Sequence, residues 1–265
     1  MTEVAFLLFW PALAGYAEAA VAYAGDTVRP GRLVRYAIWG VRLGWLAQTA
    51  LLVAQAASAD GFPWGSWAAS LNLFVWMCVG VYLIWGCRAP FRLLGLVVMP
   101  LAVVLLALAW IAGGVGEPAR SEFGNAFLAF HVGLILGAFA GFTLAAALAA
   151  LYLWQERRLK RRAPGVLRLR SPSLQTLDQL TARSVAVALP ALTIGAGIGL
   201  ARMEREGAAF DAIVGLTLLT WVVYAAFVVL RWEAGWRGRR TAYLALAGFL
   251  LVVLVRVVLT PFVHF

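Results

Sequence analysis

The chain has 265 residues, of which 63% are hydrophobic and 13% are charged, and its formal net charge is +10. Soluble proteins are about half apolar and about a quarter charged, so this composition excludes an ordinary soluble protein and indicates a polytopic membrane protein. The basic residues gather in alternate short loops, as in the cytoplasmic loops of membrane proteins, and we therefore expect no nucleic-acid binding.

Eight apolar segments reach the roughly 20 residues that a helix needs to cross a bilayer. In chain order they are Val4–Ala24, Val34–Ala57, Trp67–Cys87, Leu93–Gly113, Ala126–Leu153, Val185–Ala201, Ala212–Arg231 and Tyr243–Val263. The sequence thus predicts an all-α integral membrane protein, a bundle of about eight transmembrane helices. Residues 1–265 are expected to form a single polytopic membrane domain.

The loops predict how this bundle is oriented. The loops after the first, third, fifth and seventh segments are basic, whereas Ser58–Ser66, Gly114–Asn125 and Arg202–Asp211 are neutral or mixed. Basic loops face the cytoplasm, so both termini are expected on the extracytoplasmic side of a bacterial inner membrane. The basic residues in and next to these four loops are Arg29, Arg32, Arg35, Arg88, Arg92, Arg157, Arg158, Lys160, Arg161, Arg162, Arg168, Arg170, Arg237, Arg239 and Arg240.

The fifth segment is expected to continue as a helix beyond the membrane, as far as Pro164 and Gly165. A new helix start is predicted at Ser171-Pro172-Ser173, with Pro172 near the first helical position. Residues Leu174–Leu180 are expected to form a short surface helix that leads into the sixth segment.

Two ionisable residues lie inside the early segments. Glu18 and Arg42 are at a similar depth from the cytoplasmic side, at about 9 Å for Glu18. An isolated charge in a bilayer costs several kcal/mol, and such residues usually pair or reach the interface. We expect a structural ion pair between the two neighbouring helices, with a place on a ligand path as the alternative.

Glycines recur at every fourth position in two later segments. They are Gly133, Gly137 and Gly141 in the fifth segment, and Gly195 and Gly199 in the sixth. Small residues at this spacing allow close approach of helix backbones. The first stripe lies roughly opposite His131 on a helix, so the fifth segment is expected to dock by its glycine face and to present His131 elsewhere.

The two histidines of the chain are predicted at the same, outer face of the membrane. His131 lies just inside the fifth segment, and His264 follows the eighth. Together they form a candidate pair of iron ligands, and Arg256, about two turns before His264, is a candidate partner for an anionic group. The simpler interpretation is an interhelical hydrogen bond for His131, a loose terminus for His264 and an outward-reaching Arg256.

The outer loops contain no histidine cluster and no nucleophile–base arrangement, so the sequence offers no catalytic constellation of its own. Any ligation of haem to a cytochrome would require a partner subunit.

Several motifs together resemble the cytochrome c assembly family of CcsA and HemX-like membrane proteins. The similarity covers most of the chain and is strongest over residues 130–249. The motifs are Phe130-His131-Val132-Gly133, Tyr152-Leu-Trp-Gln-Glu-Arg-Arg-Leu-Lys-Arg-Arg, Pro172-Ser173-Leu174-Gln-Thr-Leu-Asp178, Leu192-Thr193-Ile194-Gly195, Thr220-Trp221-Val-Val-Tyr224, Gly235-Trp236-Arg237-Gly238-Arg239-Arg240 and Gly248-Phe249.

This resemblance implies haem handling at the outer face. Its haem-delivering members have two outer histidines that ligate haem iron, one on each side of a tryptophan-rich loop. His131 matches the first position and His264 is assigned to the second. The loop corresponds to the stretch that ends at Phe210 and Asp211, where Asp211 matches the terminal aspartate and Phe210 replaces a tryptophan. The cofactor implied is haem b.

The chain departs from the full haem transporters of this family, which also have two histidines within the membrane. At the corresponding positions this chain has Gln48 and Val229. Neither is a good iron ligand, so the chain resembles the degenerate HemX-like branch.

Two functions follow from the resemblance. The first is a membrane accessory protein of cytochrome c maturation that presents haem at the extracytoplasmic face, together with a cytochrome c synthase partner subunit. The alternative is a HemX-like, non-enzymatic scaffold or regulator whose partner is an enzyme of haem biosynthesis. Its contact would be the basic stretch Arg157–Arg162, for which membrane lipid is the simpler partner. A small-solute transporter has little support, because no broken pair of helices is evident.

Overall fold

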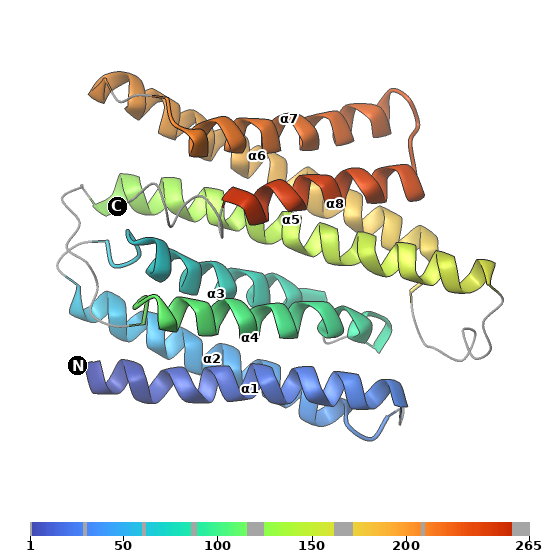
Figure 1. Ribbon diagram of the computed structural model, residues 1–265, viewed down its shortest axis with the longest axis horizontal. Helices are drawn as coiled ribbons and strands as arrows, with labels where there is room; N and C mark the ends of the chain where they lie inside the picture. The colour runs from blue at the N-terminus through green and yellow to red at the C-terminus, as the bar shows by residue number, and fades with distance from the viewer. Residues whose placement is uncertain are drawn as a thin grey trace. The chain divides into compact units, whose positions relative to one another are not determined.

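The computed structural model describes residues 2–28, 31–59, 62–85, 89–115, 125–161, 172–207 and 210–255. These residues are almost entirely helical, and no strand occurs among them. The elements are α1 (Thr2–Val28), α2 (Val34–Ser58), α3 (Trp67–Trp85), the 3-10 helix η1 (Ala89–Leu94), α4 (Gly95–Ile111), α5 (Asn125–Lys160), α6 (Leu174–Glu206), α7 (Ala212–Trp232) and α8 (Arg239–Val253) (Figure 1).

Each predicted membrane segment coincides with one of the helices α1–α8. Six of them, α1, α2, α3, α5, α6 and α7, are long and apolar enough to cross a membrane, and α4 is a shorter apolar helix. Residues 256–263 of the eighth predicted segment lie outside the described part of the chain. The all-helical prediction is confirmed, and the chain is a multi-pass membrane protein. The side on which each terminus lies stays a prediction.

The chain divides into two compact units, residues Met1–Ala129 and Phe130–Phe265. In the first unit α1 and α2 run side by side (Figure 1). Their backbones touch at glycines: a Cβ atom added at Gly15 would lie 2.7 Å from the carbonyl oxygen of Gly40 and 2.8 Å from Cα of Gly44. Contact this close is possible only without side chains, so these three glycines set the distance between the helices.

The core of the first unit contains a chain of buried amides. The Tyr16 hydroxyl donates to Gln48 Oε1 (2.7 Å), and Gln48 Nε2 donates to the carbonyl and the side-chain oxygen of Asn72 (3.0 and 2.8 Å). Asn72 Nδ2 donates to Gln55 Oε1 (3.3 Å), and Gln55 Nε2 donates to the Gly114 carbonyl (3.1 Å). These bonds join α1, α2 and α3 and provide partners for amides that lipid could not satisfy.

The second unit contains α6, α7, α8 and most of α5. The rings of Phe142 on α5 and Tyr224 on α7 stack at a centroid distance of 3.6 Å, and the Tyr224 hydroxyl donates to the Ala245 carbonyl of α8 (3.1 Å). A Cβ atom at Gly248 would lie 2.6 Å from the Tyr224 ring, so this glycine provides the space for the ring. Tyr224 therefore joins three helices.

Helix α6 differs from its prediction. It is continuous from Leu174 to Glu206, so the separate surface helix over Leu174–Leu180 is wrong. The start is close to the prediction, because the Ser173 side chain accepts a hydrogen bond from the Thr176 backbone N–H (3.1 Å) and caps the helix. No glycine or proline interrupts residues 181–184, and the Thr181 hydroxyl bonds back to the Leu177 carbonyl of the same helix (2.9 Å).

The ion pair expected between Glu18 and Arg42 is absent among the described contacts, and both side chains are exposed. The reason is the orientation of α2. Arg42 lies two residues, or about 200°, from Gly40 and from Gly44, which both face α1. Arg42 therefore points away from α1, and its guanidinium lies 5.9 Å from the centre of the Trp39 ring.

The glycine contact between α1 and α2 makes a prediction about stability. Gly15→Ala places a methyl group against backbone atoms of α2, which cannot rotate away, and is expected to lower the free energy of unfolding by about 1–3 kcal/mol. The matched control is Gly137→Ala on α5, where no described atom lies within 4 Å of the new Cβ and helix propensity improves by up to about 1 kcal/mol. Denaturation of both variants in detergent checks this. Equal stability of the two would contradict it.

Candidate functional site

His131 lies near the start of α5, at the opposite end of that helix from its basic residues. Its side chain is half-buried, and its ring nitrogen Nδ1 lies 2.8 Å from the carbonyl oxygen of Gly195 on α6. The bond spans 64 positions of sequence and fixes the ring between two helices. An interhelical hydrogen bond, the simpler interpretation of His131, is thereby confirmed.

This hydrogen bond determines which ring nitrogen bears the proton. A backbone carbonyl can only accept, so Nδ1 is the donor and carries hydrogen. In a neutral imidazole the other nitrogen, Nε2, then retains its lone pair. Histidines that ligate metals are commonly held in this way, with the remote ring N–H donated to a backbone carbonyl or carboxylate. The structural role of Nδ1 is thus compatible with a ligand role for Nε2.

Glycines of α6 provide the space for the imidazole. A Cβ atom added at Gly199 would lie 2.6 Å from His131 Cε1 and 3.3 Å from Nδ1. Gly195 packs in the same way against Ile135 and Leu134 of α5, at 2.9 and 3.2 Å. The predicted close packing at Gly195 and Gly199 is confirmed, and the flat ring of His131 fills the space that Gly199 leaves.

The expectation that α5 docks by its own glycine face is wrong. No described atom lies within 4 Å of a Cβ built at Gly133 or Gly137, whereas a Cβ at Gly141 would meet Ala188 of α6 at 2.9 Å. At this end of α5 the face that contacts α6 carries His131 itself. Helical spacing gave the relative directions of the glycines and the histidine, but it could not tell which of the two faces had a neighbour.

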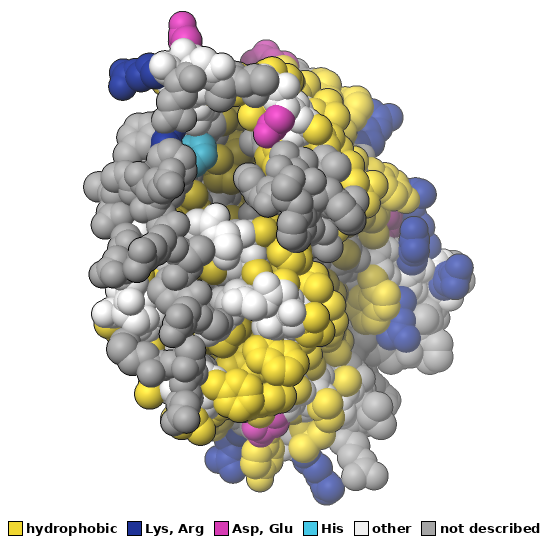
Figure 2. Space-filling view, turned by 60° about the vertical axis from the view of Figure 1, so that its left-hand side comes forward, with side chains coloured by type: hydrophobic (Ala, Val, Ile, Leu, Met, Phe, Trp, Pro, Cys, Tyr) yellow, Lys and Arg dark blue, Asp and Glu magenta, His cyan; other side chains and the backbone are white. Residues whose placement is uncertain are grey.

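His131 is accessible from outside the protein. His131 is the one histidine among the residues that the structure describes. Figure 2 shows a histidine side chain at the surface, beside a basic side chain. Arg202 follows Gly199 by three residues on α6, so it lies about one turn further along a similar side of that helix. A neutral nitrogen ligand and a cation at the same end of the second unit suit an anion that contains a metal.

The connection before α7 is shorter than the expected loop over Arg202–Asp211. α6 continues to Glu206 and ends at Gly207, whose φ of +63° is the left-handed conformation that favours glycine at a helix end. The Asp211 carboxylate accepts a hydrogen bond from the Val214 backbone N–H (2.7 Å) and caps α7. Phe210 is exposed. Asp211 thus defines where the connection ends.

Two residues of the candidate site cannot be placed. His264 and Arg256 lie outside the described residues, so the pairing of His264 with His131 stays a prediction. Within the described part, no group of three or more histidine, cysteine, aspartate or glutamate side chains is positioned to hold a metal ion. Haem iron, unlike a bare metal ion, needs only one or two protein ligands.

Gln48 and Val229, which by the resemblance replace the membrane histidines of the full transporters, lie in different surroundings. Gln48 is completely buried and makes three hydrogen bonds, to Tyr16 and to two oxygens of Asn72. Val229, on α7, is 55% exposed. Gln48 is thus fully engaged in the fold.

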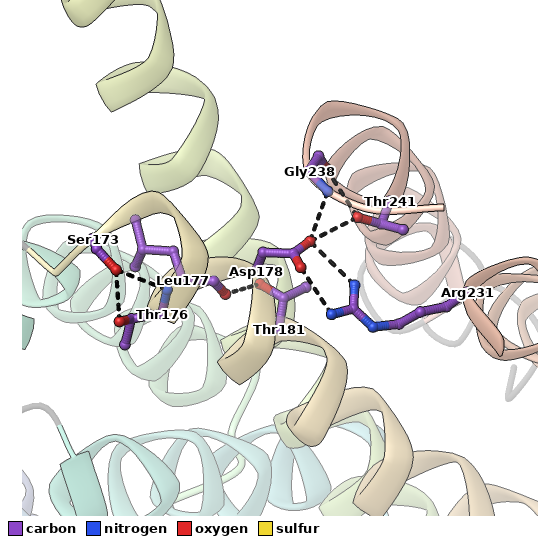
Figure 3. Close-up of polar contacts among 8 residues, drawn as sticks. All are labelled: Ser173, Thr176, Leu177, Asp178, Thr181, Arg231, Gly238 and Thr241. Atoms are coloured by element: carbon purple, nitrogen blue, oxygen red, sulfur yellow. Dashed lines mark hydrogen bonds and ion pairs between the residues drawn. The ribbon is translucent and has the colours of Figure 1, made fainter. Parts of the chain in front are cut away.

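At the far end of the second unit, Asp178 joins three helices. Its carboxylate, near the start of α6, accepts two hydrogen bonds from the Arg231 guanidinium of α7 (3.1 and 2.8 Å). It also accepts from the Gly238 N–H (2.8 Å) and the Thr241 hydroxyl (3.1 Å), at the start of α8 (Figure 3). Both charged side chains are nearly buried, with exposures of 11% and 14%. One carboxylate thus accepts four hydrogen bonds.

Sequence reasoning missed this cluster, although a signal existed. Asp178 is the one acidic residue between Arg170 and Glu204, and a lone carboxylate next to an apolar helix requires a partner. Arg231, at the end of α7, lies at the corresponding depth if α6 and α7 are antiparallel. The missing information was the turn over residues 233–238, which brings the Gly238 N–H to the same carboxylate.

The model of the family described as Cytochrome C assembly protein matches residues 64–260. The cytochrome c biogenesis protein CcsA of Microcystis aeruginosa is 26% identical and the match covers 80% of each chain, whereas Protein HemX of Brevibacillus brevis is 26% identical with 90% of each chain covered. Among solved structures, the chain is similar to the cytochrome c heme lyase CcmF, with a TM-score of 0.68 and 19% identity.

The likeness to the lyase concerns the fold alone, because its sequence identity is low. It covers 97% of this chain and 47% of the lyase, so the chain spans about half the length of that protein.

The Asp178 cluster makes a prediction about stability. Asp178→Asn leaves the nearly buried Arg231 without a counter-ion and is expected to lower the free energy of unfolding by about 2–4 kcal/mol. The double variant Asp178→Asn/Arg231→Gln is expected to recover part of this loss, because no unpaired charge remains. Glu156→Gln, which removes the exposed ion pair with Lys160, should change stability by less than about 0.5 kcal/mol. Denaturation in detergent of the four proteins measures all three effects. Equal effects of Asp178→Asn and Glu156→Gln would contradict the cluster's role.

Proposed function

Because residues 64–260 match its model, the chain belongs to the cytochrome c assembly protein family, and we propose that it is an accessory protein that handles haem at the extracytoplasmic face of the membrane. Membership supports a role in cytochrome c maturation. The presentation of haem by this chain is the proposed part. The observation that carries it is the hydrogen bond from His131 Nδ1 to the Gly195 carbonyl, which leaves Nε2 available for iron.

In the proposed site His131 and His264 would hold haem b through their ring nitrogens, and the haem would supply an iron that binds such nitrogens. Helix α6 fixes the orientation of the His131 ring, since the Gly195 carbonyl accepts its N–H and Gly199 leaves room for the ring. In this proposal Arg256 neutralises a propionate, and Asp211 belongs to the haem-binding site by shaping the connection before α7.

Arg202 is a further candidate for a propionate contact. It belongs to the same helix as Gly195 and Gly199, three residues after Gly199. An arginine near the haem edge would provide the charge-assisted hydrogen bonds that carboxylates accept from guanidinium groups. A cytochrome c synthase subunit is the proposed partner for the ligation chemistry, and a bacterial inner membrane is the proposed location.

The haem proposal is tested by absorption spectroscopy of the purified protein. The wild type from haem-replete cells is expected to show a Soret band, and His131→Ala is expected to abolish it because an axial ligand is lost. Loss of the band in the double variant His131→Ala/His264→Ala, with the single variant His264→Ala intermediate, would support the pair. A wild type that is free of haem and binds none on titration would refute the proposal.

A matched pair of glycine variants is the control for this test. Gly199→Ala places a methyl group 2.6 Å from the His131 ring and is expected to weaken haem binding about tenfold, by displacing the ring. Gly197→Ala makes the same change two residues away, where no described atom lies within 4 Å, and should leave the Soret band unchanged. Equal loss of haem in both would indicate a general effect of alanine in α6.

We also propose, as a second candidate, a HemX-like scaffold that acts through its basic face. The match to Protein HemX covers more of both chains than the match to CcsA of Microcystis aeruginosa. At the end of α5, Arg157, Arg158, Lys160 and Arg161 are exposed. Arg158 lies 4.8 Å from the centre of the Trp154 ring, which is typical of a membrane interface.

This candidate is tested by neutralising the basic end of α5. The triple variant Arg157→Gln/Arg158→Gln/Arg161→Gln is expected to recover less than about a tenth of the first enzyme of tetrapyrrole synthesis that the tagged wild type co-purifies, because the contact is electrostatic. Arg32→Gln/Arg35→Gln/Arg205→Gln, which removes the same charge at other exposed positions, is the control. Unchanged recovery in the first triple variant would exclude the scaffold, and the Soret band should be unaffected in either case.

A further inference from the structure

Glu18 and Arg42 are charged side chains that the membrane-spanning part of the first unit exposes. Glu18 lies eight residues before Asp26, where the apolar span of α1 ends, and Arg42 lies eight residues after Val34, where the span of α2 begins. Each is therefore about 12 Å from the end of its span. Because α1 and α2 are consecutive and antiparallel, these two ends lie on the same side of the membrane. Both side chains are exposed, and neither forms an ion pair with any described residue.

An exposed carboxylate at this depth would contact lipid in an isolated copy of the protein. A charged side chain near the bilayer centre costs at least about 2.5 kcal/mol, and more on an isolated helix. A glutamate side chain is too short to reach the interface over about 12 Å, and no ion pair joins Glu18 to any residue that the structure describes. An opposite charge at the same depth on a neighbouring molecule would offset the cost and keep the carboxylate ionised.

Helical geometry shows that Arg42 of the same copy is not that partner, but it places both charges beside one surface. Taking about 100° per residue from the glycine contact, Glu18 and Trp39 lie on the same side of the plane that contains the axes of α1 and α2. The Arg42 guanidinium is turned toward this side, since it lies over the Trp39 ring at 5.9 Å. This surface, which we call the α1–α2 face, thus carries one acid and one base at similar depth.

We propose that the α1–α2 face binds a second copy of this chain, with Glu18 of each copy paired to Arg42 of the other. A two-fold axis along the membrane normal keeps both copies in the same orientation and at the same depth. Rotation by 180° about such an axis places α2 of one copy opposite α1 of the other, so the two ion pairs form together. The charge pattern favours a second copy over an unrelated subunit, because the face contains both halves of each pair.

The close approach of α1 and α2 suits this arrangement. Gly15, Gly40 and Gly44 bring the two backbones together, so one narrow pair of helices carries both charges. The remainder of the face is apolar and includes Leu43 and Leu46, each 57% exposed. A two-fold pair of such faces would place apolar side chains around the two ion pairs and exclude lipid headgroups and water.

The test measures association of the full-length protein in lipid bilayers by energy transfer between copies labelled with two fluorophores, at a series of protein-to-lipid ratios. The wild type is expected to dimerise. Glu18→Arg and Arg42→Glu, each alone, should weaken the dimer about tenfold or more, because like charges then face each other. The double variant Glu18→Arg/Arg42→Glu reverses both charges and is expected to restore the dimer.

Two controls separate this contact from general effects of charge and folding. Glu204→Arg and Arg205→Glu make the same changes at exposed positions of α6 and should not alter association. Thermal unfolding in detergent should be the same for all variants, because Glu18 and Arg42 make no ion pair within the copy. A wild type that is monomeric at every ratio overturns the proposal. So does a dimer that both single variants leave intact, or a double variant that fails to restore it.

Discussion

Lipid offers no hydrogen bonds, and this constraint governs every polar group that enters the apolar part of the protein. In the first unit, Gln48, Asn72 and Gln55 satisfy one another in a chain that ends on a backbone carbonyl. In the second unit, His131 donates to the Gly195 carbonyl and Asp178 receives four hydrogen bonds from α7 and α8. These bonds select which helices are neighbours, because each has a partner on another helix.

The same constraint prepares the candidate haem site. The Gly195 carbonyl accepts the Nδ1 proton, so the fold satisfies one nitrogen of His131 and leaves the other with its lone pair. Gly199 makes this possible, since any larger residue would meet the ring. A residue that is structural through one nitrogen is therefore available as a ligand through the other, and the two interpretations of His131 are not exclusive.

The two ends of the second unit have different polar groups. One end carries His131, Arg202 and the short connection before α7. Asp211 caps the first turn of α7 there. At the other, the ion pair of Asp178 and Arg231 closes α6, α7 and α8 together. α6 takes part in both, because it runs unbroken from Leu174 to Glu206. A site at one end of a helix is held more firmly when its other end is fixed.

The sequence by itself determined the helices of the described residues, the membrane class and the family, because these follow from local hydropathy, from charge and from motifs that each lie in one segment. It could not determine which helix faces meet. Spacing gave the angle around the helix between Gly137 and His131, and between Gly40 and Arg42. It did not show which of these residues faces a neighbouring helix. Only the tertiary structure therefore decided that His131 meets Gly195, that Asp178 meets Arg231, and that Glu18 and Arg42 of one copy do not meet.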